Sequence, residues 1–200
     1  PWYWYGFDNF GFAMLMAVLA PGLLALVFGA LAFRSRVTGV YFSIITQATT
    51  LAVWYIFCRN SMRLCGTNGL TNFETIAGYS LKEPSVKLGL YLATVLSLIA
   101  VYLVCRHVVN SRLGRILIAI RDNESRLRFS GYQPLYFKVF VFSLGAIMAG
   151  IGGMLYVPQM GIITPANMGN LGVEESIVMV ICVAFGGRAT LSGAIIGALS

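Results

Sequence analysis

The run "FGFAMLMAVLAPGLLALVFGALAF", Phe10–Phe33, contains no charged residue and is long enough to cross a lipid bilayer as one helix. A hydrocarbon core of about 30 Å requires roughly 20 apolar residues in helical form. Similar apolar runs recur along the chain, and the predicted spans are about 10–33, 37–58, 86–105, 136–157 and 174–187, followed by the start of a last helix. The sequence therefore predicts an all-α polytopic membrane protein, built as a bundle of about five transmembrane helices.

The composition of the whole chain favours the same class. Of its 200 residues, 58% are hydrophobic and only 10% are charged, whereas soluble domains carry about 25% charged residues. The chain starts at Pro1 and ends at Ser200 inside an apolar run. We therefore expect both ends to be truncated and the chain to be part of a larger membrane protein.

The basic residues are unevenly distributed between the connections. Nine of the fourteen Lys and Arg residues flank or fill two of them: Arg34, Arg36, Arg106, Arg112, Arg115, Arg121, Arg126, Arg128 and Lys138. The positive-inside rule places both connections in the cytoplasm. The net charge of +7 then reflects topology and contact with anionic membrane lipid, and its placement argues against a nucleic-acid-binding surface.

The second basic connection is the polar stretch "NSRLGRILIAIRDNESRLRFSGYQP", Asn110–Pro134. Four apolar residues recur in it at helical spacing: Leu113, Ile116, Leu117 and Ile120. Gly131 and Pro134 are helix-terminating signals, so we interpret the stretch as two short helices joined at Asp122–Asn123. Anchorage to lipid headgroups explains the charge, whereas docking into the groove of a soluble partner also explains the second helix.

The predicted span 37–58 carries a polar stripe on one helical face. Its members follow the i, i+3, i+4, i+7 pattern: Ser43, Thr46, Gln47 and Thr50. The stripe either lines the path of a small neutral or zwitterionic solute or forms hydrogen bonds between helices. Gln47 favours the path, because an amide side chain is costly to bury in lipid.

Small residues mark two further segments. Gly145, Ala149 and Gly153, with Ala146 and Gly150 alongside, predict close packing of the span 136–157 against another helix. The segment "GGRATLSG" interrupts the last apolar run, so Arg188 lies either at a helix break inside the membrane or at a surface turn.

Several stretches resemble one known family: "SRLGRILIAIRDNESRLRFSGYQPLYFKVFVFSLGAIMAGIGGMLYVPQMGIITP", "FRSRVTGVYFSIITQA", "GTNGLTNF" and "GGRATLSGAIIGA". Together they cover nearly the whole chain and are similar to permease subunits of branched-chain amino-acid-type ABC importers, closest to the urea-type branch. The resemblance implies a partial importer transmembrane domain in the bacterial inner membrane. It implies import of urea or short amides, with branched-chain amino acids as the alternative from the wider family.

The resemblance also implies the partners: ABC ATPase subunits, a second permease subunit and a periplasmic solute-binding protein. By this likeness, residues 106–135 form a cytoplasmic coupling loop, and "ESRLRFSGY", Glu124–Tyr132, corresponds to the coupling helix that sits in a cleft of the ATPase. The residues expected to couple are Arg121, Asp122, Asn123, Glu124, Ser125, Arg126, Arg128 and Gly131. The family often carries alanines after the glutamate, where this chain has Ser125 and Arg126.

The sequence offers no candidate for catalysis. It contains no GxxxxGK[ST] phosphate-binding motif, and its single histidine, His107, does not make a metal site by itself. We therefore expect no catalytic residue, metal or cofactor in this chain, with ATP and Mg²⁺ bound by the partner subunits. A passive channel remains the other functional class, although a channel does not need a basic two-helix loop. A structural or lipid-anchoring membrane protein is the third.

Overall fold

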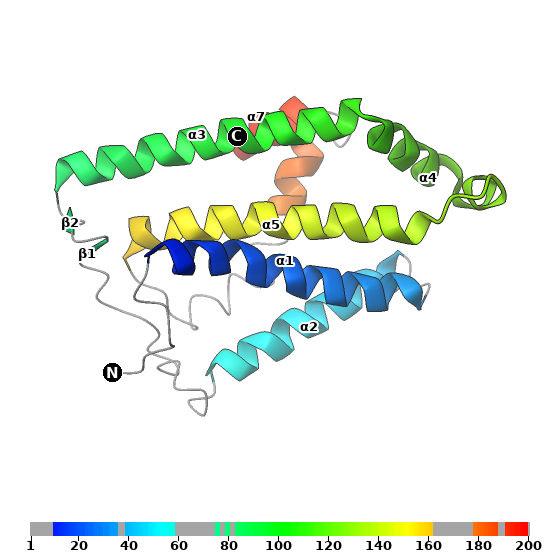
Figure 1. Cartoon of the computed structure of the whole chain (residues 1–200), viewed down its shortest axis with the longest axis horizontal. Coiled ribbons are helices and arrows are strands. Elements are labelled where there is room, and N and C mark those ends of the chain that lie inside the picture. Colours follow the sequence, from blue (N-terminus) through cyan, green and yellow to red (C-terminus); the bar gives the residue numbers. More distant parts are fainter. Residues whose placement is uncertain are drawn as a thin grey trace. The chain divides into compact units, whose positions relative to one another are not determined.

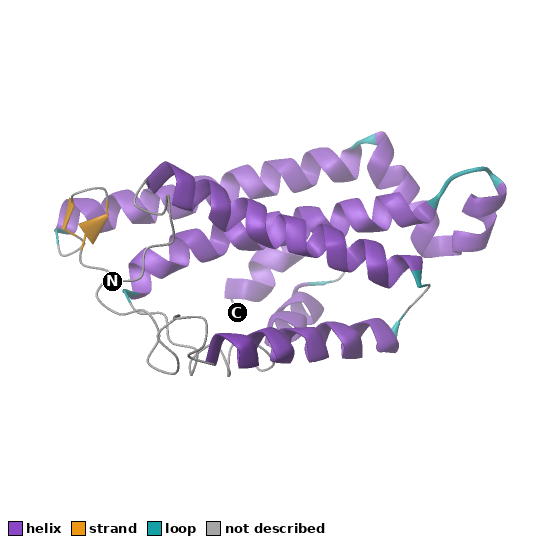
Figure 2. Ribbon diagram, turned by 60° about the horizontal axis from the view of Figure 1, so that its bottom comes forward, coloured by secondary structure: helices purple, strands orange, loops and turns teal. Residues whose placement is uncertain are grey.

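A computed structural model describes residues 10–35, 39–58, 75–76, 79–80, 83–161, 178–187 and 191–199 of the chain (Figure 1). The chain divides into two compact units. The first comprises Pro1–Thr38 and Glu74–Gln159, and the second comprises Gly39–Phe73 and Met160–Ser200. Figure 2 shows that the described residues are almost wholly helical, with one small pair of strands.

The first unit contains four helices, α1 (Phe10–Arg34), α3 (Pro84–Asn110), α4 (Arg112–Phe129) and α5 (Pro134–Met160). Two short antiparallel strands, β1 (Thr75–Ile76) and β2 (Tyr79–Ser80), precede α3. Among the described residues, three helices are long and apolar enough to cross a membrane: Gly11–Arg34, Pro84–Asn110 and Pro134–Met160. The predicted all-α polytopic membrane fold is confirmed.

The second unit contains α2 (Val40–Cys58), a helix over residues 178–186, and α7 (Leu191–Leu199). A Cβ added at Gly186 would meet the Gly193 carbonyl, and one added at Gly197 would meet the Cys182 carbonyl. The end of the earlier helix therefore lies beside the start of α7, and the middle of the earlier helix lies beside the end of α7. The two helices are antiparallel. The predicted break at "GGRATLSG" is therefore a reversal of the chain, although Arg188 itself lies outside the described residues.

Helices α1, α3 and α5 extend somewhat beyond the predicted spans, whereas α2 starts at Val40, inside the predicted span 37–58. The largest difference is in α3, which continues through Arg106 and His107 to Asn110, where the sequence analysis ended the span at Cys105. Polar side chains at the end of a membrane helix remain compatible with helical backbone, so hydropathy alone ends such a helix too early. The start of the predicted span 174–187 lies outside the described residues, as does Arg36.

Helices α1 and α5 pack closely through glycine. A Cβ added at Gly22 would lie 2.9 Å from Cγ1 of Ile147, and one added at Gly150 would lie 2.6 Å from the Ala17 carbonyl oxygen and 2.8 Å from Cγ of Pro21. Pro21 has no N–H, so the Ala17 carbonyl one turn earlier lacks its usual helical donor. Gly150 thus brings the backbone of α5 against a carbonyl that the membrane interior does not solvate.

Two of the small residues expected at this contact lie elsewhere. In the part of the chain that the structure describes, nothing lies within 4 Å of a Cβ added at Gly145 or at Gly153. The contact uses Gly150, which the sequence analysis placed beside the main series. Both series in α5 are small and helically spaced, so the pattern in α5 alone does not decide which face packs against Ala17 and Pro21 of α1.

We predict that Gly150→Ala destabilises the protein, because the added methyl group overlaps the α1 backbone and overpacking costs about 1–3 kcal/mol. Gly152→Ala is the matched control, since a Cβ there has no described neighbour within 4 Å and alanine improves helix propensity by about 1 kcal/mol. Thermal unfolding of the purified protein in detergent measures both. Equal shifts of the two midpoints contradict the assigned contact.

Candidate functional site

Helix α4 contains a break at Asn123, whose backbone is non-helical with φ −159° and ψ 96°. Residues on both sides of it are helical, so the two short helices predicted for this loop are confirmed. The first of them is joined tightly to α3. The side chain of Ser111 accepts a hydrogen bond from the Leu113 N–H at 3.2 Å, and a Cβ at Gly114 would overlap the Val109 carbonyl.

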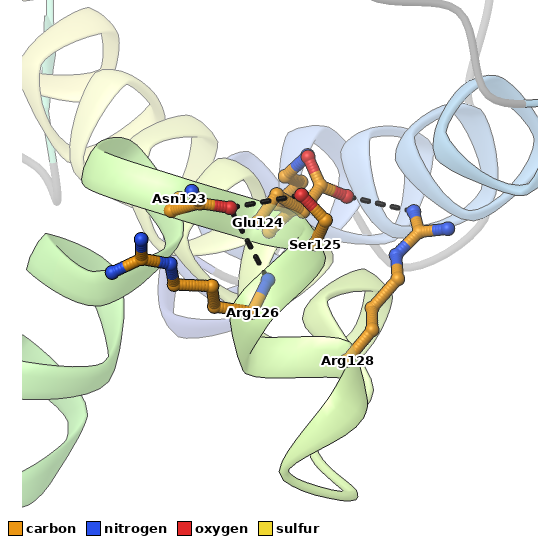
Figure 3. Close-up of polar contacts among 6 residues, drawn as sticks. Asn123, Glu124, Ser125, Arg126 and Arg128 are labelled. Atoms are coloured by element: carbon orange, nitrogen blue, oxygen red, sulfur yellow. Dashed lines mark hydrogen bonds and ion pairs between the residues drawn. The ribbon is translucent and has the colours of Figure 1, made fainter.

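The second short helix, residues 124–129, starts at a side-chain cap. Oδ1 of Asn123 accepts hydrogen bonds from the backbone N–H of Arg126 at 3.2 Å and from Oγ of Ser125 at 2.8 Å (Figure 3). Asparagine is among the best residues at this position, because its oxygen satisfies an N–H that has no partner within the helix. Asn123 therefore both breaks α4 and starts the second helix.

The same helix ends in a Schellman motif. The Gly131 N–H donates to the Arg128 carbonyl at 3.0 Å, and the Tyr132 N–H donates to the Leu127 carbonyl at 3.4 Å. Gly131 has φ +84°, a conformation that glycine adopts without a Cβ penalty. Helix α5 then starts at Pro134, a residue suited to a first helical turn. The short helix is thus fixed at both of its ends.

Glu124 connects the short helix to α5. Its Oε1 accepts a hydrogen bond from Nη2 of Arg128 at 2.8 Å, one turn along the same helix, and its Oε2 accepts one from Nζ of Lys138 at 2.7 Å. The hydrogen bond from Lys138 is the largest cause of a lowered Glu124 pKa. Partial burial opposes that shift, and Arg128 adds to it. Arg121 and Asp122 form a separate and largely exposed pair at 3.3 Å.

The short helix presents two different faces. Glu124 and Leu127 are partly buried, and Arg128 lies on their side through its bond to Glu124. On the other side Ser125 and Arg126 are exposed, and Phe129 is 92% exposed. The sequence analysis did not select Phe129. The sequence signal for Phe129 was its position as an aromatic residue in a polar stretch, two residues before a helix-ending glycine.

The polar stripe of the second unit lies on α2. Oγ1 of Thr46 donates to the Ser43 carbonyl at 2.8 Å, and Oγ1 of Thr50 donates to the Thr46 carbonyl at 2.9 Å. Both threonine donors are therefore used within the helix. Oε1 of Gln47 is buried, and no described residue donates a hydrogen bond to it. The stripe and the coupling residues belong to different units.

A polar contact that the sequence analysis missed joins α3 and α5. Nε2 of Gln159 donates to Oγ1 of Thr94 at 2.7 Å. A cavity of about 340 Å³ adjoins this contact and is lined by both residues, by Ser97 and Tyr156, and by apolar side chains. The sequence signal for this contact was the presence of two polar residues, Thr94 and Ser97, three positions apart in a predicted membrane span. Within the described ranges, no group of three His, Cys, Asp or Glu residues is placed to hold a metal ion.

We predict that Glu124→Gln lowers the thermal unfolding midpoint at neutral pH. The Glu124 pKa is lowered from its ordinary value of 4.5, so its stabilising effect is full above that value and is lost as the pH falls through the lowered pKa. The difference between the variant and the parent should therefore vanish in acid. Asp122→Asn, which removes an exposed ion pair, is the control with little effect. A difference that is independent of pH contradicts this role of the Glu124 charge.

One family model matches almost the whole chain. The family model described as "Branched-chain amino acid transport system / permease component" matches residues 2–200. The high-affinity branched-chain amino acid transport system permease protein LivM of Escherichia coli strain K12 is 25% identical over 137 residues, which are 68% of this chain and 32% of that protein.

Other relatives carry other solutes in their names. The autoinducer 2 import system permease protein LsrC of Yersinia pseudotuberculosis is 32% identical over 93 residues, 44% of this chain and 26% of that protein. The ribose import permease protein RbsC of Escherichia coli strain K12 is 32% identical over 92 residues, 45% of this chain and 29% of that protein. The matches span about a third or less of these relatives, and no solved structure matches. The chain belongs to the family of permease components of branched-chain amino-acid transport systems, as a multi-pass protein of the bacterial inner membrane.

Proposed function

We propose that this chain is the translocation part of an ATP-driven ABC importer and that the short helix after Asn123 receives the energy of ATP from a separate ATPase subunit. One observation carries the proposal: a helix fixed at both ends presents Ser125, Arg126 and the 92% exposed Phe129 on its outer face. Family membership supports it, because the family is one of permease components.

The exposed aromatic ring suits docking into a groove. Burying a phenylalanine side chain contributes roughly 1.5–3 kcal/mol, and interfaces depend on a few such anchors seated in pockets. A helix in a groove is a common recognition mode for soluble partners. Lipid anchorage explains the charge of Arg126, whereas docking into a partner also explains why the short helix is fixed at both of its ends.

The expected coupling residues divide by role under this proposal. Ser125, Arg126 and Phe129 contact the ATPase. Glu124 and Arg128 transmit movement to α5 through Lys138. Asn123 and Gly131 shape the helix ends, and the exposed Arg121–Asp122 pair contributes to the rim of the interface.

The remaining subunits follow from the same proposal. Two ATPase subunits bind ATP and Mg²⁺, a second permease subunit completes the pathway, and a periplasmic protein delivers the solute. No cofactor is bound by this chain in this arrangement, and the residues of the α2 stripe line the solute path.

For the solute we propose urea or a short amide. The uncharged stripe of α2 favours a neutral or zwitterionic molecule, and the buried Oε1 of Gln47, to which no described residue donates a hydrogen bond, suits the N–H groups of an amide. The resemblance of the loop and tail motifs to the urea-type branch supports the same choice. A branched-chain amino acid is the second candidate, supported by the match to LivM over 68% of this chain.

We predict that cysteines at positions 125 and 129 crosslink to the ATPase subunit in the assembled importer. Ser125→Cys and Phe129→Cys are introduced singly after the four native cysteines are replaced by serine. Leu127→Cys, on the partly buried face of the same helix, is the matched control and should react much less. Equal crosslinking at all three positions, or at none, contradicts docking by the outer face.

We predict ATP-dependent uptake of labelled urea into vesicles that hold the complete importer, with competition by short amides and not by leucine. Gln47→Leu should raise the apparent KM about 10-fold, because a hydrogen bond to the solute is lost with a net effect near 1.5 kcal/mol. Thr49→Val is the control, since Thr49 lies off the stripe and its hydroxyl donates to the Ile45 carbonyl.

Each alternative has its own outcome in this experiment. Competition by leucine in place of amides identifies a branched-chain amino-acid importer. Uptake that proceeds without ATP identifies a passive channel. An unchanged KM in the Gln47 variant means that the stripe does not line the path.

A further inference from the structure

A cavity of about 500 Å³ lies beneath the inner face of the short helix. Its walls come from three elements of the first unit: the end of α1, the second half of α4, and the start of α5. The side chains that matter for its chemistry are Phe33, Arg34, Glu124, Arg128, Leu135 and Lys138.

The cavity has a surplus of positive charge. Three of the lining side chains are cations and one is a carboxylate, which leaves two net positive charges. Glu124 engages one donor each from Arg128 and Lys138, whereas a guanidinium carries five N–H donors and an ammonium three. Arg34 forms no ion pair with any described residue. Several charged donors therefore face the cavity without a carboxylate to receive them.

The position of the cavity indicates what the ligand is. Arg34 is the last residue of the apolar span Gly11–Arg34, and the apolar span Pro134–Met160 begins at the other wall. Membrane helices end where the hydrocarbon core gives way to headgroups, so the cavity lies at the depth of lipid phosphates. Phe33 and Leu135 add an apolar wall to the cavity, against which the glycerol of a lipid fits.

We propose that this cavity binds the phosphate of an anionic phospholipid headgroup, with Arg34, Arg128 and Lys138 as its donors. Arginine binds phosphate through paired N–H groups, which adds geometric specificity to the charge attraction. The bound phosphate connects α1 to the short helix and to α5, three elements that Glu124 alone does not join. The site lies on the inner face of the helix and does not depend on the proposed transport function.

The test measures lipid binding by the purified full chain in neutral detergent. Phosphatidylglycerol is titrated while thermal unfolding and bound lipid, by native mass spectrometry, are followed. Phosphatidylcholine and inorganic phosphate form the other two arms. We expect saturable binding of phosphatidylglycerol, at least about 10-fold tighter than phosphatidylcholine, because both lipids carry the phosphate but the cationic cavity repels the positive charge of choline.

Arg34→Gln and Arg128→Gln should each weaken phosphatidylglycerol binding about 10-fold or more, because each removes a charged hydrogen-bond donor to the phosphate. Arg126→Gln removes the same charge from the outer face of the same helix and should leave binding unchanged. Arg34→Lys keeps the charge and should retain most of the binding. Weak binding by Arg34→Gln is then due to the missing charge and not to misfolding.

Two outcomes overturn the proposal. Equal weakening by Arg126→Gln and Arg128→Gln means that lipid binding depends on the overall surface charge and not on the cavity. Stabilisation by inorganic phosphate that equals that by phosphatidylglycerol assigns the cavity to a free anion and removes the lipid.

Discussion

The arrangement around the loop depends on one carboxylate. Glu124 accepts hydrogen bonds from Arg128 within the short helix and from Lys138 on α5, at 2.8 and 2.7 Å. Without it, three cations would face one another around a single cavity, and the short helix would lose its ion pair with α5. Surface ion pairs contribute little on average. Here the pair is partly buried and shared between two elements, so its effect is on position more than on global stability.

Under the proposed function, movement of the short helix would pass into the membrane through α5. Lys138 lies in the second turn of α5, and α5 contacts α1 through Phe142, Ile147 and Gly150. The closest of these contacts joins Gly150 to the carbonyl that Pro21 leaves without a helical donor. Because this contact involves backbone atoms and the rigid ring of Pro21, we expect α1 and α5 to move together when either is displaced.

The sequence predicted those features that follow from local patterns. Apolar runs located α1, α2, α3 and α5, and the "RDNE" stretch located the break in α4, because Asp and Asn favour caps over helix interiors. Features that depend on the identity of a distant neighbour were not predictable. Lys138 as the partner of Glu124 requires α5 to return beside α4, and the choice of Gly150 over Gly145 requires the shape of α1. Phe129 looked like an ordinary apolar residue until its exposure on a capped helix was known.

The two faces of the short helix also separate Ser125 and Arg126 from the residues that hold the helix in place. Both residues lie on the outer face, away from Lys138 and the cavity. A change at these positions alters the surface offered to a partner and leaves the bonds of Glu124 intact. The Oγ of Ser125 even adds a hydrogen bond to the Asn123 cap at 2.8 Å. The inner face holds the helix in place, and the outer face is the one that the proposed function assigns to the ATPase.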